Sequence, residues 1–262
     1  MKIIFAITQT VWKEMIRRKD LYVVLIIQLF FTFLLSTLNT FGTTAPARYI
    51  LDLGLLVAFI LSIILAITLT ARQFPGEVRT GTIFTVLTKP ITRTELLLGK
   101  WLGCWSSMLL ANASFYLIIA SITTFMGHHI DITTYFQVFC LHNSMIGILI
   151  AITLFFTQFV SQGAGSSLSF VLLFLSYYFV PRIPHLLVTE HSWRHSTLLG
   201  LYYIAPHFEL FDMRRRFVHD WGALDFSTLL ITLLYGVLLT AGFLLLAWLK
   251  LRRKQFRRGA VA

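Results

Sequence analysis

The chain has 262 residues, of which 57% are hydrophobic and 13% are charged, and its net charge is +11. Soluble domains average about 45–50% apolar and about 25% charged residues, so this composition excludes a soluble protein with an anchor. It indicates one all-α integral membrane domain over residues 1–262. The excess of basic over acidic residues raises nucleic-acid binding as an alternative function. The basic residues form no stripe interleaved with aromatic side chains, however, so no nucleic-acid partner is expected.

The N-terminal residues predict an amphipathic helix that lies in the membrane interface as an elbow. On a helical wheel, Trp12 and Ile16 fall on the apolar half and Lys13 and Arg17 on the polar half. We expect the indole of Trp12 at headgroup depth and the cations facing anionic lipid. The alternative is a simple extension of the first span.

Six stretches further along the chain are apolar enough to cross a membrane, whose hydrocarbon core takes about 20 helical residues. The fifth is short, so its edges are the hardest to place. The predicted spans run near residues 21–41, 49–71, 102–126, 135–160, 166–181 and 227–249.

The distribution of basic residues predicts the orientation of these spans. If both termini face the cytoplasm, 16 of the 22 lysines and arginines lie in cytoplasmic segments, as the positive-inside rule requires. We therefore expect a multi-pass protein of the cell's inner, cytoplasmic membrane. The cytoplasmic basic residues would be Lys2, Lys13, Arg17, Arg18, Lys19, Arg72, Arg79, Lys89, Arg93, Lys100, Lys250, Arg252, Arg253, Lys254, Arg257 and Arg258.

Between spans two and three, a dense run of polar signals extends from Glu77 to Lys100. Pro75 and Gly76 interrupt the chain first. A short helix then follows, capped by Thr80 or Thr82, with an apolar face of Ile83, Phe84, Val86 and Leu87. Exposed apolar residues beside charges suit docking to a soluble partner. The alternative is an amphipathic loop helix that rests on lipid.

The end of this run also carries local signals. Pro90 stops the short helix, because proline disfavours helical backbone at the preceding residue, Lys89. Thr92 and Glu95 have the spacing of a capping box, so a second helix should begin there and continue into the third span.

These residues resemble the signature of type-2 ABC transporter permeases, an exporter family with six spans, an elbow helix and a coupling helix between spans two and three. The matching positions are Glu77, Gly81-Thr82, Lys89-Pro90, Arg93, Glu95 and Gly99-Lys100; weaker matches are Asp52 and the stretch from Tyr202 to Asp212. The chain looks closest to the small permeases of nitrous-oxide-reductase maturation and gliding motility. The resemblance implies a dimer, and it implies that the coupling to an ATPase falls on Glu77, Gly81, Thr82, Phe84, Leu87, Lys89, Pro90 and Arg93.

An ATP-driven exporter needs an ATPase, and this chain has no phosphate-binding loop. Its only Gly-Lys pair, Gly99-Lys100, is followed by Trp101, and residue 94 is Thr where such a loop requires Gly. We expect this chain to be a transport subunit and not an enzyme, with no cofactor of its own. ATP and magnesium would bind a separate ABC ATPase subunit. The second permease could be an identical copy or a paralogue.

Polar residues within the spans should face the bundle interior and hydrogen-bond between helices. They are Gln28, Asn39, Asn112, Gln137, His142, Asn143 and Gln158. Asp52, near the outer end of span two, could reach headgroup water or pair with Arg48. The segment from 182 to 226 is expected to fold as a re-entrant or interfacial helical hairpin, because Pro206 prevents it from spanning.

Two functions other than ATP-driven export remain open from the residues alone. One is an intramembrane enzyme that uses His128, His129 and Asp131 at the outer surface, although no nucleophile motif accompanies them. The other is a secondary transporter that works alone, although no internal repeat is evident. His191 and His195 have a metal-compatible spacing without further ligands at matched spacing, so no metal site is expected.

Overall fold

The computed structural model describes residues 2–37, 46–75, 92–127, 129–185 and 193–253. Within these ranges the chain forms helices and no strand, which confirms the all-α class. The longer helices are α1 (Lys2–Arg18), α2 (Asp20–Thr37), α3 (Pro46–Ala71), α6 (Arg93–Phe125), α7 (Ile132–Phe156), α8 (Gln162–Tyr178), α10 (Trp193–Ile204) and α12 (Phe226–Arg253). Shorter helical elements are η2 (Val180–Arg182), η3 (Phe208–Phe211) and α11 (Arg214–Val218).

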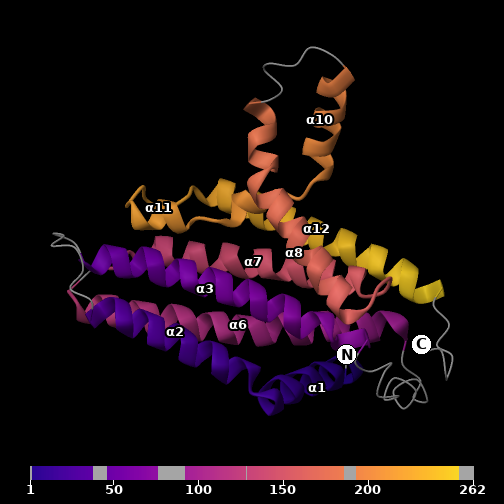
Figure 1. Ribbon diagram of the computed structural model, residues 1–262, viewed down its shortest axis with the longest axis horizontal. Coiled ribbons are helices and arrows are strands. Elements are labelled where there is room, and N and C mark those ends of the chain that lie inside the picture. The colour runs from indigo at the N-terminus through magenta and orange to yellow at the C-terminus, as the bar shows by residue number, and fades with distance from the viewer. Residues whose placement is uncertain (1, 38–45, 76–91, 128, 186–192, 254–262) are drawn as a thin grey trace.

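Six of these helices, α2, α3, α6, α7, α8 and α12, are long and apolar enough to cross a membrane. Five of them run lengthwise through the bundle, and α8 leaves it obliquely (Figure 1). Each of these helices begins one to nine residues before the span predicted from hydropathy. Thr92 caps α6 and Asp131 caps α7, so each helix starts at its cap and not where the apolar run begins.

Helix α7 is the core of the bundle. Of its most apolar stretch 78% is buried, against 11% for α2, and it contacts α3, α6, α8 and α12. Its packing with α12 is close at Gly236, where an added Cβ would lie 2.4 Å from Ser144 Oγ. A helix surrounded on all sides must be apolar around its whole circumference, and α7 has that composition.

The polar residues of the spans lie inside the bundle, as predicted. His142 contacts Ser62 Oγ through Nε2 at 2.8 Å and Tyr116 Oη through Nδ1 at 3.1 Å, which links α7 to α3 and α6. Asn112 Nδ2 donates to Asn143 Oδ1 at 3.0 Å. Gln28, Gln137 and Gln158 are also buried, and Asn39 lies outside the described residues.

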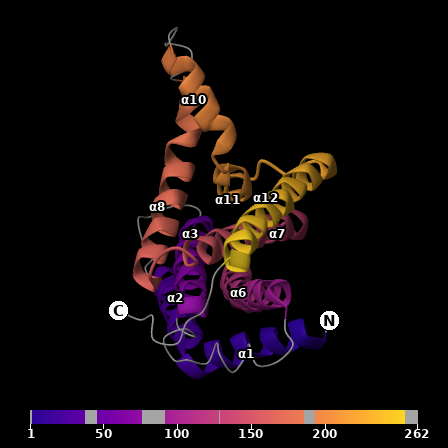
Figure 2. The same ribbon diagram turned by 90° about the vertical axis from the view of Figure 1, so that its right-hand side faces the viewer.

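Helix α1 is separate from α2, with a break at Lys19, whose φ is +62°. It lies across the bundle rather than along it (Figure 2) and packs on α6. The contact is close because α6 presents glycines: a Cβ on Gly99 would lie 2.8 Å from Ile7 Cβ, and one on Gly103 would lie 2.8 Å from Val11 Cβ. Small residues four apart allow two helices to approach at backbone distance.

The predicted apolar half of α1 proves to be divided between two environments. Ile7, Val11 and Met15 are buried against the bundle, whereas Ile16 is 48% exposed. The indole of Trp12, which we expected at headgroup depth, donates to Ser106 Oγ of α6 at 2.8 Å. The apolar half of α1 covers more surface than one neighbouring helix can contact. Only the central stripe of that half therefore packs on α6.

Between α8 and α12 the described residues, 179–185 and 193–225, form short helical elements and no further candidate span. Helix α10 runs beside the end of α8 and projects with it from the bundle (Figures 1 and 2), while η3 and α11 lie against α7. The amide of Gln137 fixes the approach to α12, because its Nε2 donates to Leu224 O at 3.0 Å and its Oε1 accepts from Leu224 N at 2.8 Å.

Replacing Gly103 with Ala should weaken the docking of α1. The new methyl group would meet the branched Cβ of Val11, which cannot swing aside, and overpacking of this kind costs about 1–3 kcal/mol. We expect a lower thermal unfolding midpoint for the purified protein in detergent. Gly242→Ala is the matched control, because nothing lies within 4 Å of its added Cβ. An equal midpoint for both variants would contradict the close contact.

Candidate functional site at the basic end of the bundle

Segments that are far apart in the sequence meet at one end of the bundle, where α1 begins and α12 ends (Figure 1). We call it the basic end and define it by α1, residues 72–75, residues 92–100 and residues 250–253. The three basic segments of the described chain that were predicted to be cytoplasmic therefore share one end, although 53 positions separate Lys19 from Arg72 and 150 separate Lys100 from Lys250.

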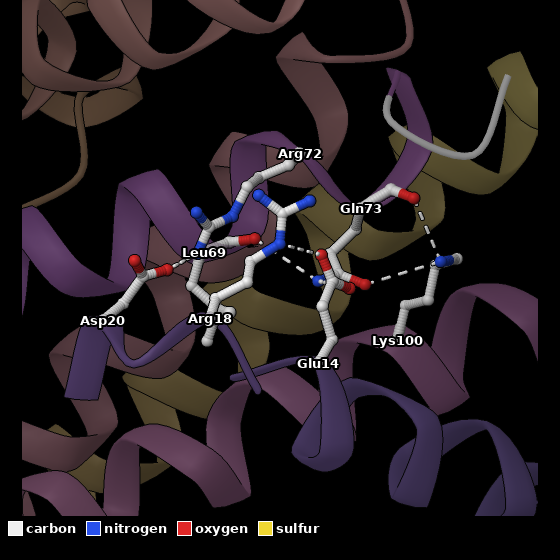
Figure 3. A network of polar contacts seen from close by, with 7 residues as sticks. All are labelled: Glu14, Arg18, Asp20, Leu69, Arg72, Gln73 and Lys100. Carbon is white, nitrogen blue, oxygen red and sulfur yellow. Dashed lines mark hydrogen bonds and ion pairs between the residues drawn. The ribbon is translucent and has the colours of Figure 1, made fainter. Parts of the chain in front are cut away.

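A network of polar contacts joins α1, the end of α3 and the start of α6 (Figure 3). Gln73 is its centre: its Nε2 donates to Glu14 Oε2 at 3.4 Å, and its main-chain oxygen accepts from Lys100 Nζ at 3.1 Å. Arg18 Nε lies 3.1 Å from Glu14 Oε1. Lys100 is 1% exposed, and its ammonium also lies over the ring of Phe74 at 5.3 Å. Burying a lysine at this depth requires such partners.

A second contact of the network joins the elbow region to the end of α3. Arg72 and Asp20 form an ion pair through Arg72 Nη2 and Asp20 Oδ2, with side chains only 14% and 33% exposed. Asp20 is also the first residue of α2, where a carboxylate interacts favourably with the positive end of the helix dipole. The residues on the N-terminal side of 76–91 are thus tied to both α1 and α2.

The residues on the C-terminal side of 76–91 are held equally well. The predicted capping box is present: Glu95 N donates to Thr92 Oγ1 at 3.2 Å, and Thr92 N donates to Glu95 Oε2 at 2.9 Å. Arg93 Nη1 donates to the main-chain oxygens of Leu251 and Arg252. A guanidinium placed on the last carbonyls of a helix satisfies groups that have no partner within the helix. Arg93 therefore joins α6 to the end of α12.

Of the residues implied in ATPase coupling, only Arg93 falls within the described chain. Glu77, Gly81, Thr82, Phe84, Leu87, Lys89 and Pro90 lie outside the described residues. The roles of Glu14, Asp20, Arg72 and Gln73 in this network were not predicted, because polar residues near the ends of spans are ordinarily solvent-facing flanking residues. One usable signal was the spacing of Gly99 and Gly103, which marks the face of α6 that receives α1.

The opposite end of the bundle holds a second polar group. Arg214 Nε and Nη2 donate to the two carboxylate oxygens of Asp212 at 2.8 and 2.7 Å, and Tyr177 Oη donates to Asp212 Oδ2. Burial acts to raise the pKa of Asp212, but the hydrogen bonds and charge of Arg214 outweigh it and hold this pKa below its usual value. The Arg214 guanidinium also lies 3.9 Å from the ring centre of Phe59.

Of the three residues proposed for an intramembrane enzyme, the structure describes His129, which is exposed, and Asp131. Asp131 caps α7, accepting from Thr133 N and Thr134 N at 3.2 Å. His128 and His191 lie outside the described residues, as does the side chain of His195. Among the described residues no group of three or more His, Cys, Asp and Glu side chains could hold a metal ion.

The fold and this end-on clustering of basic segments define the class of protein: an all-α, multi-pass membrane protein with six candidate spans and a separate N-terminal helix. A family model described as "ABC-2 family transporter protein" matches residues 6–252. The chain therefore belongs to the ABC-2 transporter family and is a membrane component of such a transporter. No curated protein matches the chain.

Replacing Arg93 with Gln should loosen the end of α12. The variant loses a charged donor to two carbonyls, one contact being partly buried and the other exposed, so the loss should be near the ordinary value of about 0.5–1.5 kcal/mol for a hydrogen bond. We expect a lower thermal midpoint and faster proteolysis after α12. The midpoint of Arg93→Lys should lie between those of the wild type and Arg93→Gln, because an ammonium keeps the charge but lacks the planar geometry of a guanidinium. Arg253→Gln is the control, because Arg253 is exposed and lies in the last turn of α12. A drop in its midpoint as large as that of Arg93→Gln would contradict the capping role of Arg93.

Proposed function

We propose that this chain is the permease subunit of an ATP-driven export complex, that it dimerises with an identical copy or a paralogue, and that each copy binds an ABC ATPase through residues 77–93. ATP and magnesium bind the partner and not this chain. ATP-driven closure of the two ATPases moves this segment, and access alternates at the interface between the two permeases.

The observation that carries this proposal is the bracing on both sides of residues 76–91. Before them, Arg72 and Gln73 contact Asp20 and Glu14 of the N-terminal helices. After them, Arg93 contacts the end of α12. A displacement applied between these braces reaches α1, α2, α3, α6 and α12 together. A segment resting on lipid would not need five helices joined at its ends.

The proposal requires the basic end to face the cytoplasm. Single-cysteine variants at Thr88 and Gln255 should react with a membrane-impermeant thiol reagent only from the cytoplasmic side, and one at Thr133 only from the other side. The reason is the charge asymmetry between the two ends, which follows the positive-inside rule. The native cysteines are first replaced by serine. Reaction of the Thr88 variant from outside would contradict both the orientation and the ATPase contact.

Phe84→Asp should weaken the binding of the ATPase. Phe84 lies on the apolar face predicted for residues 81–89, and an unpaired carboxylate buried in a protein contact costs about 2–5 kcal/mol. Association should fall by roughly tenfold or more, at about 1.4 kcal/mol per decade. The measurement is pull-down of the partner ABC ATPase at matched membrane levels of wild-type and variant permease.

Thr133→Asp is the control for this experiment. Thr133 is exposed in the first turn of α7, at the opposite end of the bundle, where a carboxylate is tolerated. It should leave pull-down unchanged. If Phe84→Asp also leaves pull-down unchanged, residues 81–89 do not form the ATPase contact.

A further inference from the structure

A groove of about 560 Å³ lies between α3, α8 and α11, away from the basic end. One wall is a single face of α3, formed by Asp52, Leu56, Ile60 and Ile64, which are spaced four residues apart. The opposite wall is aromatic and comes from α8, with Phe174 and Tyr178 exposed toward it. This groove is unrelated to the polar network around residues 76–91.

Three charged residues line the groove. They are Asp52 of α3 and Arg214 and Arg215 of α11, and the remaining lining residues are apolar or aromatic. Arg214 is already committed to Asp212 in a two-pronged ion pair, and Tyr177 donates to the same carboxylate. These contacts fix the rim of the groove and remove Arg214 as a free cation.

Asp52 and Arg215 therefore remain as the two charges available to a ligand. Both are exposed, and within the described part of the chain neither side chain forms an ion pair or hydrogen bond, including with the other. Arg48, which the sequence offered as a partner for Asp52, instead pairs with Asp220. An opposite pair of uncompensated charges at the mouth of an apolar groove matches a headgroup that carries both signs.

The length of the groove matches one leaflet of a bilayer. The twelve residues from Asp52 to Ile64 rise about 18 Å along α3, at about 1.5 Å per residue. Half of the hydrocarbon core of a bilayer measures about 15 Å. An acyl chain of a lipid whose headgroup lies at Asp52 and Arg215 would thus extend along Leu56, Ile60 and Ile64 toward the middle of the membrane.

We propose that this groove is a binding site for one phospholipid with a zwitterionic headgroup, with its phosphate at Arg215, its ammonium at Asp52 and an acyl chain between α3 and α8. A lipid with an anionic headgroup satisfies Arg215 alone. A neutral lipid that has neither phosphate nor ammonium offers no partner to Arg215 or to Asp52. The site requires the fold and the membrane, and it does not depend on the ATPase contact proposed above.

The test uses the full-length purified protein in detergent. Delipidated protein is offered phosphatidylethanolamine, phosphatidylglycerol or diacylglycerol, and retained lipid is counted by native mass spectrometry. Thermal midpoints are measured in parallel, since a ligand that binds the folded state raises the midpoint. We expect phosphatidylethanolamine to be retained most, phosphatidylglycerol less and diacylglycerol least, with midpoints in the same order.

Three variants separate the parts of the site. Arg215→Gln should reduce retention of both phospholipids by about tenfold, because a charged contact to phosphate is lost. Asp52→Asn should remove the preference for phosphatidylethanolamine over phosphatidylglycerol and leave phosphatidylglycerol retained. Ile60→Trp, at a position 47% exposed in the groove, should displace all three lipids by filling the space.

Arg182→Gln and Asp225→Asn serve as matched controls, because both residues are exposed and neither lines the groove. They should retain lipid as the wild type does. Equal retention of all three lipids by the wild type would overturn the proposal, and so would an Asp52→Asn variant with its preference intact. Disulfide crosslinking of Ile60→Cys between two copies in membranes would also overturn it, since a second copy would then occupy the groove.

Discussion

Polar groups inside an apolar bundle must find partners on neighbouring helices, and in this protein those partners converge on α7. His142 connects to α3 through Ser62 and to α6 through Tyr116, while Asn143 accepts from Asn112. The indoles of Trp101 and Trp105 donate to main-chain oxygens of Gly147 and Asn143. Each bond is modest, at about 0.6 kcal/mol, but together they set the rotation of α3 and α6 about one central helix. The other helices are positioned relative to that core.

The two ends of the bundle use charge differently. At the basic end, Arg72, Arg93 and Lys100 each contact a segment remote in sequence, so cations serve as connectors between helices. At the opposite end, Asp212 and Arg214 neutralise each other within two residues of chain. The first arrangement transmits displacement between helices, and the second stiffens a local rim. A transporter driven from one side needs the connections at that side, which agrees with the function proposed here.

Much of the fold follows from the sequence because composition and spacing act locally. The six spans, the Thr92–Glu95 capping box and the burial of Gln28, His142 and Asn143 were all predicted, since each depends on a short run of residues. The hydrogen bond of Trp12 to Ser106 was not predicted, because the two residues are 94 positions apart and no local pattern connects them. The roles of Arg72 and Gln73 were missed for the same reason. Residues 77–90 lie outside the described chain, so their part in the site rests on the sequence alone.

The hydrogen bonds of the Gln137 amide affect where the chain between α8 and α12 can change in length. Its side-chain amide forms two hydrogen bonds with Leu224, one to the main-chain oxygen and one from the main-chain N–H, as a paired residue of a neighbouring β-strand would. Glutamate lacks the donor and asparagine lacks the reach, so few residues can replace it. The start of α12 is thereby anchored to α7 directly and not through the chain that precedes it. Insertions or deletions before η3, between residues 182 and 204, can accumulate during evolution without shifting the register of the last helix.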